Sequence, residues 1–143
     1  MSKGNTFEND FLLLIFNGTG IANIADNAAS SPLGNLYVSL HTADPGEAGS
    51  QTTNETAYGS YARVAVARNS GGWTVTANAV ENTALVQFPQ CSSGSSTITH
   101  FAVGTATSGA GKVLYKGELS ASLAVSSGIQ PQFAAGALDI QED

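Results

Sequence analysis

The fold class follows from residues 36–46, which read LYVSLHTADPG. Apolar residues occupy every second position of the first half, and this period of two predicts a half-buried β-strand. The strand is expected to end at Asp44-Pro45-Gly46, because proline fixes the first turn dihedral and glycine accepts the second. A polar, glycine-containing stretch follows, so residues 46–60 are expected to form an exposed loop.

The same period of two recurs along the rest of the chain. Short strands separated by frequent turns are typical of an antiparallel β-sandwich or a barrel-like domain. Asn69-Ser70-Gly71-Gly72 is expected to form a hairpin loop between two strands. Pro131 indicates an edge strand or a bulge, because proline cannot donate to a central ladder. The expected strands are residues 36–41, 61–68, 73–77, 84–88, 98–103, 113–119, 129–133 and 137–140.

A short helix is expected before the strands, ending at Asn17-Gly18, where glycine can adopt the left-handed stop. Its apolar residues at helical spacing, which we name the helix stripe, are Phe7, Phe11, Leu14 and Ile15. Such a stripe must dock either on its own domain or on a neighbour, and we predict that it is an assembly interface. The expected organisation is a helix with an irregular connecting arm over residues 1–35 and a β-sandwich domain over residues 36–143.

The composition predicts a surface that is covered by protein in the working state. Only 11% of the 143 residues are charged, whereas a typical soluble domain has about 25%. An uncharged polar surface is cheap to desolvate, and charge is depleted at the core of protein interfaces. The alternative interpretation is a monomer whose surface happens to be neutral and polar.

The charge balance argues against two classes of partner. The net charge is −6 with only five basic residues, and these form no cluster. A nucleic-acid binder needs clustered cations to displace the counterions of phosphate, and binding to an anionic membrane surface needs them too. We therefore expect neither nucleic acid nor membrane as a partner.

No catalytic or metal-binding pattern is visible in the sequence. His41 and His100 lack a nearby second ligand and are interpreted as polar strand residues. Cys91 is a lone cysteine without a neighbouring base. Asp44 and Glu47 share one turn and could hold a hard cation such as calcium, but a solvated turn is the favoured interpretation. We expect a non-enzymatic chain with no catalytic residues, no metal and no cofactor.

Aromatic residues give a second alternative that the sequence leaves open. They could line a sugar-binding surface, or they could be core residues and cross-strand pairs. The residues concerned are Tyr58, Tyr61, Trp73, Phe101 and Tyr115.

Several blocks, spread over nearly the whole chain, resemble a family of small phage virion structural proteins. Members of this family are often labelled tail fibre proteins, and related ones look like capsid decoration or cement proteins. The order and spacing of the blocks carry the resemblance, and they comprise residues 7–16, 36–46, 54–55, 61–66, 98–105 and 133–138.

The resemblance implies a β-sandwich without catalysis that is made in the bacterial host cytoplasm and incorporated into the virion. The expected function is capsid decoration, in which the protein binds and stabilises the head shell. The alternative is a tail fibre or tail-tip component that contacts the host receptor through the loops at residues 46–60 and 91–97. The expected partners are the major capsid protein or other virion proteins, together with further copies of the chain in a trimer or dimer.

Overall fold

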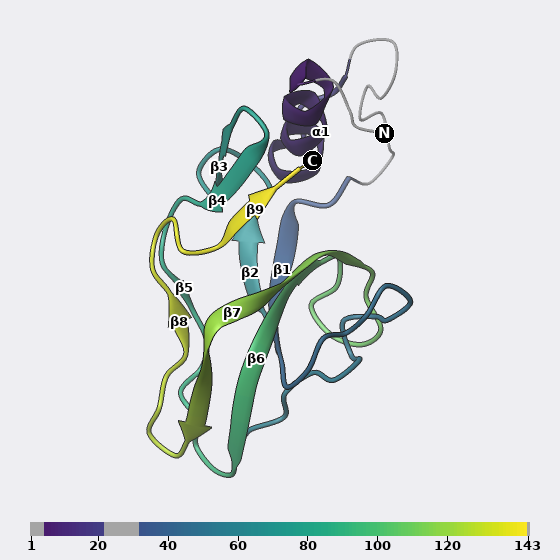
Figure 1. Cartoon of the computed structure of the whole chain (residues 1–143). Helices are drawn as coiled ribbons and strands as arrows, with labels where there is room; N and C mark the ends of the chain where they lie inside the picture. The colour runs from purple at the N-terminus through teal and green to yellow at the C-terminus, as the bar shows by residue number, and fades with distance from the viewer. Residues whose placement is uncertain (1–4, 22–31, 143) are drawn as a thin grey trace. The chain divides into compact units, whose positions relative to one another are not determined.

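The computed structural model describes residues 5–21 and 32–142 (Figure 1). One helix and nine strands lie in these ranges. None of the helical structure described is long and apolar enough to cross a membrane. In chain order the elements are α1 (Asn5–Asn17), β1 (Asn35–His41), β2 (Val64–Ala67), β3 (Trp73–Thr76), β4 (Ala79–Asn82), β5 (Val86–Gln87), β6 (Ser95–Gly104), β7 (Val113–Ser126), β8 (Gln132–Phe133) and β9 (Asp139–Gln141).

The strands form three sheets. One has the order β2-β1-β6-β7, the second β3-β4-β9, and the third pairs β5 with β8. The pairs β1–β6, β6–β7, β3–β4 and β4–β9 are antiparallel. The expected class, mainly β with antiparallel sheets and one short N-terminal helix, is confirmed, and the sheets do not close into a barrel.

The chain divides into two compact units. Unit 1 comprises residues 1–35, 66–86 and 133–143, and unit 2 comprises residues 36–65 and 87–132. The expected N-terminal arm thus falls in unit 1 together with two later segments of the chain. Most of its irregular part, residues 22–31, lies outside the described residues.

Unit 1 is built around one face of α1, which packs against β3 and β4. Leu12, Phe16 and Trp73 are each 0% exposed, and the Phe16 and Trp73 rings meet edge to face with centroids 4.8 Å apart. The helix ends as expected at Gly18, which has a φ of 69°. The helix end has a second stabilising contact that was not predicted. The Arg68 guanidinium donates hydrogen bonds to the carbonyls of the last turn, where a cation also complements the helix dipole.

The hairpin expected at residues 69–72 is wrong. A turn does occur there, with the Gly72 N–H donating to the Asn69 carbonyl, but the flanking strands β2 and β3 belong to different sheets. Trp73 begins β3 with its side chain buried against Phe16, and β3 pairs with β4, a strand that the sequence pattern did not predict. Packing on the helix therefore overrides the local glycine signal.

The strand expected at residues 36–41 is present as β1, but it is not half-buried. Residues 38–41 are all buried, including Ser39 and His41 at 0% exposure. The expectation failed because the following loop folds back over the polar residues of β1: the Thr53 carbonyl accepts a hydrogen bond from His41. The turn after β1 is as expected, with the Gly46 N–H bonded to the Asp44 carboxylate.

The β3–β4 hairpin turns through only two residues, Ala77 and Asn78, because Thr76 pairs with Ala79. Ala77 has a φ of 54°, although the first position of such a turn favours glycine when φ is positive. A side chain with a Cβ in the left-handed region costs about 1–2 kcal/mol.

Ala77→Gly is therefore expected to raise the free energy of unfolding by up to about 1 kcal/mol, since the greater chain entropy of glycine offsets part of the gain. Ala79→Gly, two residues on in β4, is the control and is expected to lower stability by about 0.5–1 kcal/mol. Urea denaturation of both variants measures the difference. A loss of stability in both would show that Ala77 is not strained.

Candidate functional site

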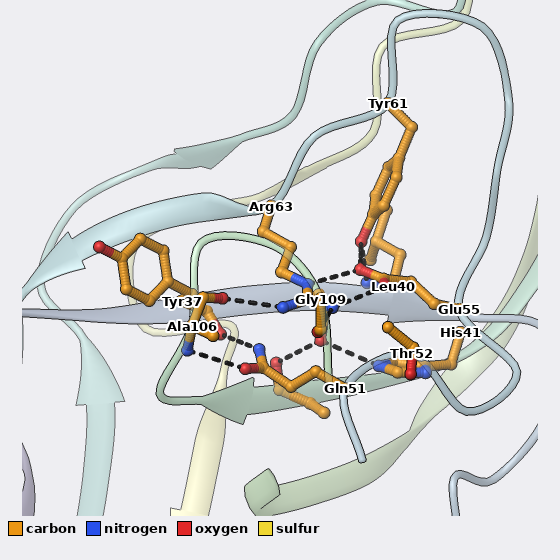
Figure 2. A network of polar contacts seen from close by, with 12 residues as sticks. Tyr37, Leu40, His41, Gln51, Thr52, Glu55, Tyr61, Arg63, Ala106 and Gly109 are labelled. Carbon is orange, nitrogen blue, oxygen red and sulfur yellow. Dashed lines mark hydrogen bonds and ion pairs between the residues drawn. The ribbon is translucent and has the colours of Figure 1, made fainter. Parts of the chain in front are cut away.

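A buried ion pair lies at the centre of a network of polar contacts in unit 2 (Figure 2). Arg63 Nε lies 2.7 Å from Glu55 Oε1, and Arg63 Nη2 lies 2.8 Å from Glu55 Oε2. The two side chains are only 3% and 14% exposed, respectively. Hydrogen bonding to Glu55 raises the pKa of the Arg63 guanidinium, so Arg63 is charged at any physiological pH.

The remaining donors of Arg63 reach a loop that is distant in sequence. Nη1 donates to the Ala106 carbonyl at 2.9 Å, and Nη2 donates to the Gly109 carbonyl at 2.8 Å. Charge-assisted hydrogen bonds of this kind are stronger than those between neutral groups. Arg63 therefore holds the loop at residues 105–111 against the segment that carries Glu55.

Tyr61 joins this ion pair to β1, an inner strand of the four-stranded sheet. Its hydroxyl donates to Glu55 Oε1 at 2.9 Å and accepts the Leu40 N–H at 3.0 Å. Burial raises the pKa of the Tyr61 hydroxyl above its usual value, and the nearby Glu55 carboxylate adds to the effect. The hydroxyl therefore stays protonated and acts as a fixed link between β1 and Glu55.

Gln51 makes a second connection between the same two loops. Its side chain is 0% exposed, donates to the Tyr37 carbonyl at 3.2 Å and accepts the Ala106 N–H at 3.0 Å. Its backbone N–H donates to the Gly111 carbonyl. A Cβ at Gly104 or Gly111 would lie 2.2 Å from atoms of the Gln51 side chain, so a side chain at either position would displace Gln51.

His41, at the end of β1, holds the loop that carries Thr53. Its Nδ1 lies 2.9 Å from the Thr53 carbonyl, which can only accept, so Nδ1 carries the proton. Nε2 then accepts from the Ser39 hydroxyl at 2.9 Å. Burial lowers the pKa of the His41 imidazole, which keeps it neutral in this arrangement. The interpretation of His41 as an ordinary polar strand residue is thus incomplete, since its ring is buried and structural.

These contacts pin two loops side by side and leave their tips in solvent. We name the exposed residues of the two loops the loop platform. Its side chains are short, polar or small, and Asp44 and Glu47 both lie within reach of the Lys116 ammonium, at 3.0 Å and 3.6 Å. The loop platform consists of Thr42, Ala43, Asp44, Glu47, Ala48, Thr52, Asn54, Thr107, Ser108, Gly109 and Ala110.

The charged side chains and the buried histidine of this region are bonded within the chain itself. The Glu55 carboxylate, the Arg63 guanidinium and the His41 ring each bond to at least two groups of the chain. Within the described residues, no group of three or more His, Cys, Asp or Glu side chains could hold a metal ion. Of the aromatic residues considered for a sugar-binding surface, Tyr58, Trp73 and Phe101 are buried and support the core interpretation.

The helix stripe lies in unit 1 beside the buried face of α1. The buried row is Glu8, Leu12 and Phe16. Phe7 is 41% exposed and contacts Phe11, with ring centroids 6.2 Å apart. Phe11, Leu14 and Ile15 are partly buried. The helix thus docks in its own unit through the neighbouring row, and the role of the stripe in assembly remains a prediction.

Sequence reasoning missed Gln51, Glu55 and Arg63 as a group. Arg63 falls within the strand expected at residues 61–68, whereas β2 begins one residue later and Arg63 is buried. These side chains bond to a loop that lies up to 55 residues away in the sequence, as in the contact of Gln51 with Ala106. No local sequence pattern could reveal such contacts. The one available signal was the scarcity of basic residues, which makes an arginine in an apolar stretch unusual.

The comparisons with known proteins agree with the earlier resemblance. The family described as podophage GP4 fiber I protein gp80 matches residues 5–141. No curated protein matches the chain. The match covers nearly the whole sequence, so the chain belongs to this family of phage fibre proteins, and the expectation of a phage virion structural protein is confirmed.

Arg63→Ala is expected to lower the free energy of unfolding by about 3 kcal/mol, because it leaves the Glu55 carboxylate without a partner in a largely buried place. It should also speed amide exchange at residues 105–111. Arg63→Lys should recover only part of the loss, since lysine cannot bond two carboxylate oxygens and two carbonyls at once.

Lys116→Ala is the matched control, since it removes a solvent-exposed ion pair with Asp44 and should leave stability unchanged. Chemical denaturation and hydrogen exchange measure both effects. Equal stability of the Arg63→Ala and Lys116→Ala variants would contradict the pinning role of Arg63.

Proposed function

We propose that this chain, as a member of a phage fibre family, is a fibre component that presents the loop platform to the host surface. The single observation that carries the proposal is the buried Glu55–Arg63 pair, whose remaining donors hold the loop at residues 105–111. Loops on a rigid scaffold are frequent binding elements. A loop that is already ordered loses less entropy when it binds.

The chemistry of the loop platform supports a contact surface that works by hydrogen bonding. Its hydroxyl and amide groups, such as those of Thr52, Asn54 and Ser108, offer adaptable donors and acceptors. The Lys116 ammonium offsets one of the two negative charges of Asp44 and Glu47. The surface therefore carries little net charge and fits a neutral polar ligand better than a strongly anionic one.

Attachment to the rest of the particle is assigned to the helix stripe. Phe7 exposes a large aromatic surface next to Phe11, and burial of aromatic side chains contributes much of the energy of protein interfaces. The partner is another virion protein or a further copy of the chain. A capsid decoration protein would attach through the helix stripe in the same way. The location of the chain in the particle, on the head or on a fibre, therefore distinguishes the two roles.

Ser108→Arg tests the host-contact role, because Ser108 is exposed on the loop platform and a long cation there disturbs a neutral contact. Particles carrying the variant are expected to adsorb to the host about tenfold more slowly, which corresponds to a loss of about 1.4 kcal/mol. Ser70→Arg, at an exposed position of unit 1, is the control and should adsorb normally.

Gold-labelled antibody on intact particles completes this test. Label on fibres together with slower adsorption supports the proposal. Label spread over the head, with adsorption unchanged by Ser108→Arg, overturns it and assigns the chain to capsid decoration.

Phe7→Asp tests the attachment role, since a charge in the helix stripe must be desolvated when the stripe is covered. The variant should be depleted at least tenfold from purified particles, while its thermal unfolding in isolation is unchanged. Leu85→Asp, at a residue 53% exposed in the same unit, is the matched control and should be incorporated normally. Normal incorporation of the Phe7→Asp variant would show that the helix stripe is not part of the attachment interface.

A further inference from the structure

The outer edge of β7 is a second candidate contact, in unit 2. β7 is the last strand of its sheet and pairs only with β6 among the described strands. It runs over Val113–Ser126, and most of its residues are exposed or half-buried. An edge strand offers a row of backbone N–H and C=O groups that another strand can pair with.

The distal half of this edge lacks the usual protection against pairing. No Asp, Glu, Lys or Arg occurs between Glu118 and Asp139, so residues 119–138 are uncharged. Proteins commonly block free edges with charged side chains or proline, and β7 contains neither beyond Glu118. Depletion of charge is a property of surfaces that become buried in interfaces.

Two register irregularities interrupt the pairing of β7 with β6, and the larger one separates the distal segment of β7 from the rest. Ile98 pairs with Leu123 and His100 pairs with Glu118, so one residue of β6 lies opposite residues 119–122 of β7. Extra residues of this kind bend a strand. Beyond the bend, residues 123–126 return to a regular ladder with residues 95–98. This distal segment is the part that can accept a further strand in straight register.

We propose that two copies of the chain pair antiparallel through the distal edge of β7, about a two-fold axis at Ala124. The inference goes beyond the proposed function, because it concerns contact between copies and not contact with the host. Residues 122–126 read SLAVS, which is nearly the same in both directions. In this register Ser122 faces Ser126 of the second copy, Leu123 faces Val125, and Ala124 faces itself.

The exposure of these residues fits the register. Val125 is buried and Leu123 half-buried, so both point to the covered face of the sheet, whereas Ser122, Ala124 and Ser126 are exposed. Pairing would place Leu–Val contacts on the covered face and Ser–Ser and Ala–Ala contacts on the open face. Such cross-strand pairs stabilise a sheet, and no like charges meet.

Self-complementarity is the reason to assign a second copy as the occupant. A two-fold interface uses the same patch on both partners, so each residue must suit its own symmetry mate. A shift by one residue would set Leu123 and Val125 opposite exposed residues of the second copy, so that the covered face of one sheet would adjoin the open face of the other. The ladder is short, so the contact is expected to be weak in solution and to gain strength from repeated contacts in a particle.

Cysteine cross-linking of the purified full-length chain tests the register. Ala124→Cys places two thiols at the axis, where paired Cα atoms are about 4.5–5.5 Å apart, within the range of a disulfide. Ala121→Cys is the matched control: it is exposed on the same strand, but three residues from the axis the two thiols would be about 20 Å apart. The native Cys91 is buried, so the parent protein sets the background.

Charge substitution tests the pairing of Ser122 with Ser126 independently. In the Ala124→Cys background, Ser122→Lys with Ser126→Lys should reduce the disulfide dimer at least tenfold, because like charges face each other across the axis. Ser122→Glu with Ser126→Lys places opposite charges in the same positions and should restore it. Thermal unfolding of each variant controls for folding.

The expected result is a covalent dimer from Ala124→Cys, little from Ala121→Cys, and rescue by the opposite-charge pair. Equal cross-linking of both cysteine variants, cross-linking only at residue 121, or no dimer from either would overturn the proposal. A reduction by both charge combinations would also overturn it. None of these outcomes depends on host adsorption, so the proposed function is tested separately.

Discussion

The buried Glu55–Arg63 ion pair is the interaction on which the arrangement of the loop platform in unit 2 depends. Without it, the segment after β1 and the loop before β7 would lack their strongest common partner. Replacing a buried pair with apolar residues is often neutral or favourable for stability, so such a pair is better understood as a constraint on geometry. Here it allows one arrangement of the two loops, because the planar guanidinium bonds a carboxylate and two carbonyls in fixed directions.

The sequence predicted the features that local signals encode. The helix at the N-terminus, the strand at residues 36–41 and the turn at Asp44-Pro45-Gly46 were correct, because periodicity, glycine and proline act within a few residues. The burial of His41 was not predicted, since it depends on a loop that returns to cover the strand. Periodicity describes one strand and cannot show what lies over its polar face.

The errors in unit 1 have a similar origin. Gly71-Gly72 suggested a hairpin that does not form, whereas the true hairpin turns at Ala77-Asn78, where alanine occupies a position that favours glycine. Trp73 explains both results, because its burial against Phe16 fixes β3 beside the helix. Unit 1 is assembled from three separate segments, so its contacts are invisible to any short window of sequence.

The hydrogen bonds that Arg63 and Gln51 make to the loop at residues 105–111 all fall on its backbone. Arg63 bonds the carbonyls of Ala106 and Gly109, and Gln51 bonds the Ala106 N–H and the Gly111 carbonyl. Every amino acid supplies a carbonyl, and all but proline supply an N–H. The side chains of Thr107, Ser108 and Ala110 at the tip of the loop can therefore change without the loss of these hydrogen bonds, so sequence variation at these positions leaves the backbone of the loop in place.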